Sequence, residues 1–135
     1  MSDEEEVLLL KERGNAAYRD KKYQDAICLW TEAEVKLKRR GDTTSNLAIA
    51  IRSNLIMAFM QSQLYERVVK ESTLLLEDDP RHFKTLARRG TARERLANNR
   101  GSTASAQERK ELHNMAVNGT YPLLLYCLIY YCFIV

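Results

Sequence analysis

Apolar and polar residues along positions 4–96 follow the spacing of amphipathic helices. Between Glu4 and Arg19, apolar or small residues recur every three or four positions. The same spacing resumes after a polar break at 20–22 and predicts helices at Tyr23 to Arg40, Asn46 to Gln61, Tyr65 to Glu77 and Arg81 to Leu96, with a weaker sixth at Ala104 to Ala116. Long alternating runs of Val, Ile and Thr are absent before the C-terminus, so the pattern predicts an all-α protein.

Turn-forming residues separate the predicted helices. The run from Gly41 to Ser45 is polar, and Ser45 or Thr44 suits the N-cap of the helix that follows. Pro80 ends the fourth helix, because the residue before a proline is pushed out of the helical region. A polar loop is predicted at 98–103, before the sixth helix.

The chain repeats itself with a step of 34 residues. Asn54 and Arg88 are 34 apart, as are Ile56 and Gly90, while Gly14 and Ile56 are 42 apart, which is 34 plus eight. The extra eight residues fit a longer second helix and loop around 36–43. A period of 34 built from two antiparallel helices is the signature of the tetratricopeptide repeat.

The chain resembles the tetratricopeptide family over about residues 7–97. The matching positions are Gly14-Asn15-Ala16-Ala17-Tyr18, Tyr23, Ala26 and Trp30 in repeat one, Asn54, Ala58, Tyr65 and Pro80 in repeat two, and Arg88-Arg89-Gly90 and Ala92 in repeat three. Ile56, Val68 and Arg13 depart from the pattern. The resemblance implies an all-α helix-turn-helix solenoid of two full repeats plus a partial third, in which stacking buries the apolar face of each helix pair.

These patterns divide the chain into a repeat domain and a tail. The domain covers 1–97, with repeat one at about 7–45, repeat two at about 49–82 and a partial third repeat at about 83–116. The tail, 117–135, is apolar and carries no charge from Tyr121 to Val135. Its 15 apolar residues are fewer than the roughly 20 that span a bilayer. The alternatives are an organelle-membrane anchor, packing on the solenoid, and a non-homologous or truncated end.

Composition narrows the class of function. The 135 residues suit one domain, and the net charge of +3 is too small to indicate a nucleic-acid binder by itself. Three cysteines, an odd number without metal-ligand spacing, favour a reducing compartment. The acidic start at 3–6 is unlike a signal peptide, so the expected location is cytoplasmic. No nucleophile lies beside His82 or His113, and the glycines are isolated, so we predict no enzyme activity, catalytic residue, cofactor, metal or small-molecule substrate.

Five polar residues recur at matching places on the first helix of each repeat. We call Lys11, Asn15, Asn54, Lys84 and Arg88 the five-residue set. Lys11 and Asn15 are four residues apart, as are Lys84 and Arg88, so each pair shares a helix face. Amines, amides and a guanidinium together form a receptor for carboxylates, and asparagine within a helix needs a reason because it forms helices poorly.

The five-residue set resembles, position by position, the carboxylate clamp of tetratricopeptide co-chaperones. The resemblance implies an adaptor that binds the Glu-Glu-Val-Asp tails of the cytosolic 70 and 90 kDa heat-shock chaperones. Lys11, Asn15 and Asn54 would take the main-chain carboxylate, and Lys84 and Arg88 the acidic side chain and backbone. Tyr18, Met57 and Met60 lie about one turn beyond these residues. They either line a pocket for an apolar peptide side chain or belong to the core.

A basic segment supports a different class of function. From residue 81 to residue 111 the chain has nine Lys or Arg against three Glu, with arginines at Arg81, Arg88, Arg89, Arg93, Arg95 and Arg100. A scaffold for RNA or another acidic surface is therefore an alternative. No aromatic platform interleaves with these arginines, which weakens the case for single-stranded nucleic acid.

Overall fold

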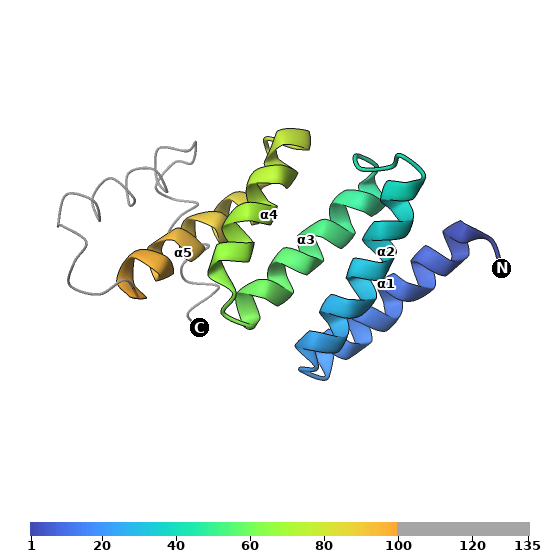
Figure 1. Ribbon diagram of the computed structural model, residues 1–135, viewed down its shortest axis with the longest axis horizontal. Helices are drawn as coiled ribbons and strands as arrows, with labels where there is room; N and C mark the ends of the chain where they lie inside the picture. The colour runs from blue at the N-terminus through green and yellow to red at the C-terminus, as the bar shows by residue number, and fades with distance from the viewer. Residues whose placement is uncertain (100–135) are drawn as a thin grey trace.

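The computed structural model describes residues 1–99 and shows five helices and no strand within them. The helices are α1 (Asp3–Arg19), α2 (Tyr23–Arg39), α3 (Asn46–Gln61), α4 (Tyr65–Asp78) and α5 (Phe83–Asn99). They follow one another along the long axis of the molecule, and α1, α3 and α5 run in the same direction (Figure 1). This part of the chain is an all-α tetratricopeptide-type solenoid of two helical hairpins, α1–α2 and α3–α4, followed by α5.

Most of the predicted helix ends lie close to the observed ones. Each boundary of α1 to α4 differs from its prediction by no more than one residue. The fifth helix begins two residues later than predicted, at Phe83, and ends three residues later, at Asn99. The predicted loop therefore starts too early at 98, because neither Asn98 nor Asn99 is a strong enough breaker to end the helix. The predicted helix at 104–116 and the apolar run 121–135 lie outside the described residues.

The two hairpins close with the same turn. Lys21 and Gln63, which are 42 residues apart, have left-handed φ angles of 61° and 59°. The Lys22 N–H donates to the Ala17 carbonyl at 2.9 Å, and the Leu64 N–H donates to the Phe59 carbonyl at the same distance. Both turns are Schellman caps, which bond the last free carbonyls of a helix. Their spacing of 42 matches the insertion of eight residues inferred from the repeat.

The core lies where the hairpins pack together. Trp30 is fully buried, and its indole N–H donates to the Lys11 carbonyl at 3.1 Å. The same continuous core contains the other buried apolar residues, Val7, Leu10, Ala26, Ala33, Leu37, Ala48, Ile51, Leu55, Ile56, Ala58, Phe59, Val68, Leu75 and Ala92. The indole therefore fills the space inside the first hairpin, and its hydrogen bond anchors the backbone of α1 at Lys11, where the five-residue set begins.

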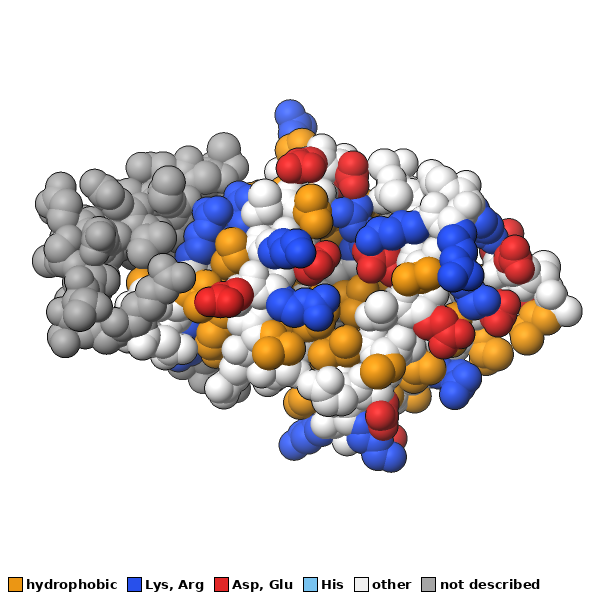
Figure 2. Space-filling model, viewed as in Figure 1, with side chains coloured by type: hydrophobic (Ala, Val, Ile, Leu, Met, Phe, Trp, Pro, Cys, Tyr) orange, Lys and Arg blue, Asp and Glu red, His pale blue; other side chains and the backbone are white. Residues whose placement is uncertain are grey.

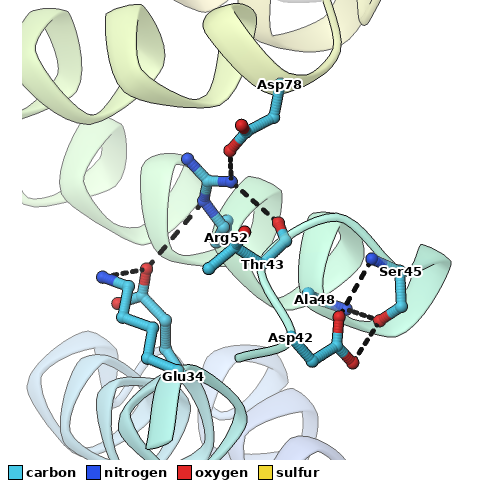
Figure 3. A network of polar contacts seen from close by, with 8 residues as sticks. Glu34, Asp42, Thr43, Ser45, Ala48, Arg52 and Asp78 are labelled. Carbon is cyan, nitrogen blue, oxygen red and sulfur yellow. Dashed lines mark hydrogen bonds and ion pairs between the residues drawn. The ribbon is translucent and has the colours of Figure 1, made fainter. Parts of the chain in front are cut away.

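Arg52 joins both hairpins through polar contacts (Figure 3). On α3, its Nη1 donates to the Thr43 carbonyl at 3.1 Å and to Asp78 Oδ2 on α4 at 2.6 Å. Its Nε lies 3.9 Å from Glu34 Oε1 on α2. Ser45 caps α3, as predicted, by accepting from the Ala48 N–H at 3.1 Å. These contacts fix how the second hairpin sits on the first.

Candidate functional site

Two asparagines of the five-residue set meet between α1 and α3. Asn54 Nδ2 donates to Asn15 Oδ1 at 3.3 Å, and Asn15 Nδ2 donates to Glu12 Oε1 at 3.5 Å. Both asparagines are half-buried within their helices. Each primary amide has two N–H donors and a carbonyl, so both retain capacity for another partner. The contact brings two members of the set, 39 residues apart in sequence, to one place.

Arg88 approaches the same part of α3 from α5. Its Nη1 donates to the Ser53 carbonyl at 3.0 Å and to Ser53 Oγ at 2.9 Å. Only 9% of the residue is exposed, and no carboxylate within residues 1–99 lies at ion-pair distance from it. Burial lowers the pKa of the guanidinium, while nearby Tyr18 opposes that shift. Arginine stays charged at neutral pH, so this is a buried cation held by neutral partners.

The two lysines lie one turn away from the asparagines and Arg88. Lys11 precedes Asn15 and Lys84 precedes Arg88 by four residues, which is about 6 Å along a helix. Because α1 and α5 run in the same direction (Figure 1), Lys11 is offset from Asn15 in the same direction as Lys84 is offset from Arg88. Lys11 is half-buried and Lys84 is exposed. Each lysine therefore starts one helical turn nearer the N-terminus of its helix than its partner in the set.

The three candidate pocket residues border the core. Tyr18, Met57 and Met60 are half-buried and pack against it. The Tyr18 ring lies 5.2 Å from the Tyr23 ring and 5.9 Å from the Trp30 ring, centroid to centroid. Burial chiefly raises the pKa of Tyr18, Tyr23 adds to the rise, and Gln61 and Arg88 oppose it. The phenol is thus neutral near pH 7, and its ring packs against the aromatic residues at the edge of the core.

Ser53 is a member of this site that the sequence reasoning missed. It is 7% exposed and receives both hydrogen bonds from Arg88. A signal was present, because Arg52, Ser53 and Asn54 are three consecutive polar residues inside an otherwise apolar stretch of α3. Consecutive helical residues point about 100° apart. Arg52 accordingly contacts both α2 and α4, Ser53 contacts α5, and Asn54 contacts α1.

The contacts of the arginines weigh against an open basic surface. Arg88 is buried, and Arg89 Nη1 donates to Thr73 Oγ1 at 3.4 Å. On the face seen in Figure 2, Lys and Arg side chains are interspersed with Asp and Glu. Two of the five arginines between residues 81 and 99 are therefore directed at protein groups.

The described residues contain no candidate metal site and no candidate membrane-spanning helix. No group of three or more His, Cys, Asp or Glu side chains within them could hold a metal ion. Within the same residues, no helix combines the length and apolar character needed to cross a bilayer.

The stacked helical hairpins define a tetratricopeptide-type helical repeat module, a class built on helix pairs with a 34-residue step. In sequence, the chain is similar to mitochondrial import receptor subunits from two organisms. It is 32% identical over 99 residues to the mitochondrial import receptor subunit TOM70 of Mus musculus, covering 73% of this chain and 16% of that protein. It is 33% identical over 115 residues to the mitochondrial import receptor subunit TOM70 of Saccharomyces cerevisiae, covering 85% of this chain and 16% of that protein.

The chain matches only a small part of each relative. The chain spans about one sixth of the length of the relatives, 16% in each case. No family model matches the chain. The similarity therefore supports the repeat fold over most of this chain, and it concerns one part of a much longer receptor.

Proposed function

We propose that this chain is a peptide-binding adaptor that holds the acidic C-terminus of a cytosolic 70 or 90 kDa heat-shock chaperone. The observation that carries the proposal is Arg88, a buried cation whose hydrogen bonds within residues 1–99 go only to the neutral Ser53. A buried charge without a counter-ion is unfavourable, so a ligand carboxylate beside it gains a strong charge-assisted hydrogen bond. Arg88 on α5 contacts Ser53, and Asn15 on α1 contacts Asn54, so two consecutive residues of α3 hold members of the five-residue set from the helices on either side.

The charged and amide groups of the five-residue set indicate the kind of partner. A C-terminal aspartate has two carboxylates a few ångströms apart, and the five-residue set offers two amines, two amides and a guanidinium. The tail sequence Glu-Glu-Val-Asp supplies this end, and Tyr18, Met57 and Met60 would contact its valine or an upstream apolar residue. The function proposed is binding rather than catalysis, in keeping with a helical repeat module.

Calorimetry with two peptides tests the proposal. A Glu-Glu-Val-Asp peptide with a free C-terminus should bind at micromolar Kd, about −8 kcal/mol. Its C-terminal amide should bind at least about tenfold more weakly, because the amide removes one carboxylate from the clamp. Equal binding of acid and amide would rule out the clamp.

Lys84 offers the cleanest variant, because it is exposed and its removal should leave the fold intact. Lys84→Ala should cost about 1.5 kcal/mol of binding, the lower end for a hydrogen bond to a charged group. Lys70, an exposed lysine on α4 outside the five-residue set, is the matched control. If Lys70→Ala weakens binding as much as Lys84→Ala, the effect is general electrostatic attraction and not a specific site.

We further propose that the module acts at a mitochondrial membrane, as a chaperone receptor. Two observations favour this location: the similarity to mitochondrial import receptor subunits, and the uncharged apolar run 121–135. The full chain should float with vesicles of mitochondrial lipid composition, and a chain lacking 121–135 should stay in the soluble fraction. Flotation of both chains would place the membrane contact elsewhere, and flotation of neither would refute the location.

A further inference from the structure

Arg88 uses only one of its nitrogens on the protein groups that surround it within residues 1–99. Nη1 makes both hydrogen bonds to Ser53, one to the carbonyl at 3.0 Å and one to Oγ at 2.9 Å. A guanidinium has five N–H donors in a rigid planar fork. Two of them point at Ser53, and the three on Nε and Nη2 make no hydrogen bond within the described part of the chain. Because the fork is planar, holding Nη1 also fixes the direction of the Nε–Nη2 edge.

That edge is the one that suits a carboxylate. Two parallel N–H groups match the two oxygens of a carboxylate in a bidentate pair, which is the strongest form of this contact. A bidentate pair depends on angle, so its strength depends on what orients the guanidinium. Within residues 1–99 the only hydrogen bonds of the Arg88 guanidinium go to Ser53, which is 35 residues away in sequence and on a different helix.

We propose that Ser53 is a positioning residue of the acid-binding site: its hydroxyl and carbonyl hold Arg88 Nη1 so that the Nε–Nη2 edge is presented to the ligand carboxylate. This inference rests on the proposed function. Asn54, the next residue on α3, contacts Asn15 on α1. Neighbouring residues of one helix thus position the arginine on one side and join the asparagines on the other.

The burial of Ser53 supports a specific task for its hydroxyl. The residue lies within α3 and is only 7% exposed. A buried hydroxyl is unfavourable without a partner, and Arg88 is its partner here. Alanine at this position would leave the Ser53 carbonyl as the single acceptor. One hydrogen bond allows the guanidinium to pivot, whereas two define its plane.

The simpler interpretation is that Ser53 and Arg88 only join α3 to α5. A structural contact of that kind would affect unfolding, and it would affect equally a Glu-Glu-Val-Asp peptide (the acid) and a Glu-Glu-Val-Asn peptide (the amide), which lacks the side-chain carboxylate assigned to Arg88. A positioning role instead changes the ratio of the two affinities, because only the aspartate side chain needs the aligned edge. The ratio of acid to amide binding therefore separates the two interpretations.

The experiment compares Ser53→Ala, Ser53→Thr and Arg88→Lys in the full chain, with the Glu-Glu-Val-Asp and Glu-Glu-Val-Asn peptides measured by calorimetry. Ser53→Ala should weaken binding of the acid about five- to tenfold, the value of one hydrogen bond, and change amide binding less than about twofold. Ser53→Thr keeps the hydroxyl and should restore most of the ratio. Adding Ser53→Ala to Arg88→Lys should have no further effect, because lysine has no planar edge to orient.

The outcomes distinguish this inference from the proposed function. If Ser53→Ala keeps the wild-type acid-to-amide ratio while Arg88→Lys lowers it, Ser53 has no positioning role and the clamp stands. If Ser53→Ala weakens acid and amide equally, the contact is only structural and the inference is again wrong. If the wild-type protein binds Glu-Glu-Val-Asp no better than its C-terminal amide, the proposed function fails and this inference fails with it.

Discussion

Gly14 lies where α1 comes nearest to α2, and the contact leaves no room for a side chain. A Cβ built at this position would lie 2.3 Å from Trp30 Nε1 and 2.6 Å from its Cδ1. The indole cannot move freely, because it is fully buried and bonded to the Lys11 carbonyl. Gly14 therefore permits the packing that holds Lys11 and Asn15 in place.

Gly14→Ala should therefore destabilise the fold even though alanine is the better helix former. The expected loss is about 1–3 kcal/mol of unfolding free energy, the usual range for overpacking, measured by urea denaturation. Trp30→Phe provides the control, since phenylalanine lacks the pyrrole atoms that a Cβ would meet. The double variant should lose less than the sum of the single losses. An additive result would locate the strain somewhere other than the indole.

At the residue scale, the sequence indicated which side chains to examine but not what holds them. Spacing alone placed Asn15 and Asn54 on the first helices of successive repeats, and the structure joins them at 3.3 Å. The exposure of Arg88 was not predictable, because periodicity gives a face of a helix and not the depth of a side chain. Ser53 was missed because a lone serine has no pattern of its own, and its partner is 35 residues away.

At the element scale, the ends of the helices were predictable because capping chemistry is local. Ser45 caps α3 through Ala48, three residues on, and Asp42 accepts from the Ser45 N–H at 3.0 Å. These hydrogen bonds involve neighbours in sequence, so the polar loop indicated them. The contacts of Arg52 with Glu34 and Asp78 join residues 18 and 26 apart, and no short-range pattern reveals them.

The N-terminus of α5 should respond to pH through His82. The Thr85 N–H donates to His82 Nδ1 at 3.4 Å, and the Thr85 hydroxyl lies 2.9 Å from the same atom. Burial chiefly lowers the pKa of His82, with Arg88 and Lys84 acting in the same direction and Asp79 opposing. The folded state thus resists protonation that the unfolded state accepts near pH 6.5.

Stability from His82 is therefore fully present above about pH 6.5 and lost as the pH falls through its lowered folded-state value. Unfolding free energy, measured by urea at pH 7.5 and 5.5, should decrease on acidification. His82→Asn keeps a capping acceptor without the titration and should give a flatter profile. His113 is present in both proteins, so its titration cancels in the difference. Identical pH profiles for the two proteins would exclude a role for His82.

At the scale of the whole molecule, Arg52 determines how the two hairpins stay together. Its side chain is 11% exposed, and Glu34, its partner on α2, is 14% exposed. Arg52→Ala should lower the unfolding free energy by about 1.5–3 kcal/mol, since it removes charged hydrogen bonds from a partly buried place. Lys38 also pairs with Glu34 but is 53% exposed, so Lys38→Ala should cost about 0.5 kcal/mol or less. Equal losses would mean that burial of the network does not matter.

An acidic peptide should stabilise the stack most at its two ends. The five-residue set draws on α1, α3 and α5, so a ligand bound by all of it joins the first hairpin to α5. Within residues 1–99, α5 packs chiefly against α4 and α3, and its polar tie to α3 is the Arg88–Ser53 pair. Elements with few supporting contacts open at low free energy, so α5 should exchange its amide hydrogens faster than α3.

Hydrogen exchange with and without the peptide measures this directly. At a free-acid concentration of 100 times Kd, the folded state gains about 2.7 kcal/mol by linkage. Exchange should slow in α1 and α5, with little change in the turn at 20–22, which the peptide does not reach. The amide peptide at the same concentration should protect less in proportion to its weaker binding. Protection confined to α5 would mean that the ligand engages Lys84 and Arg88 alone, and that the asparagines contribute packing between hairpins and not recognition.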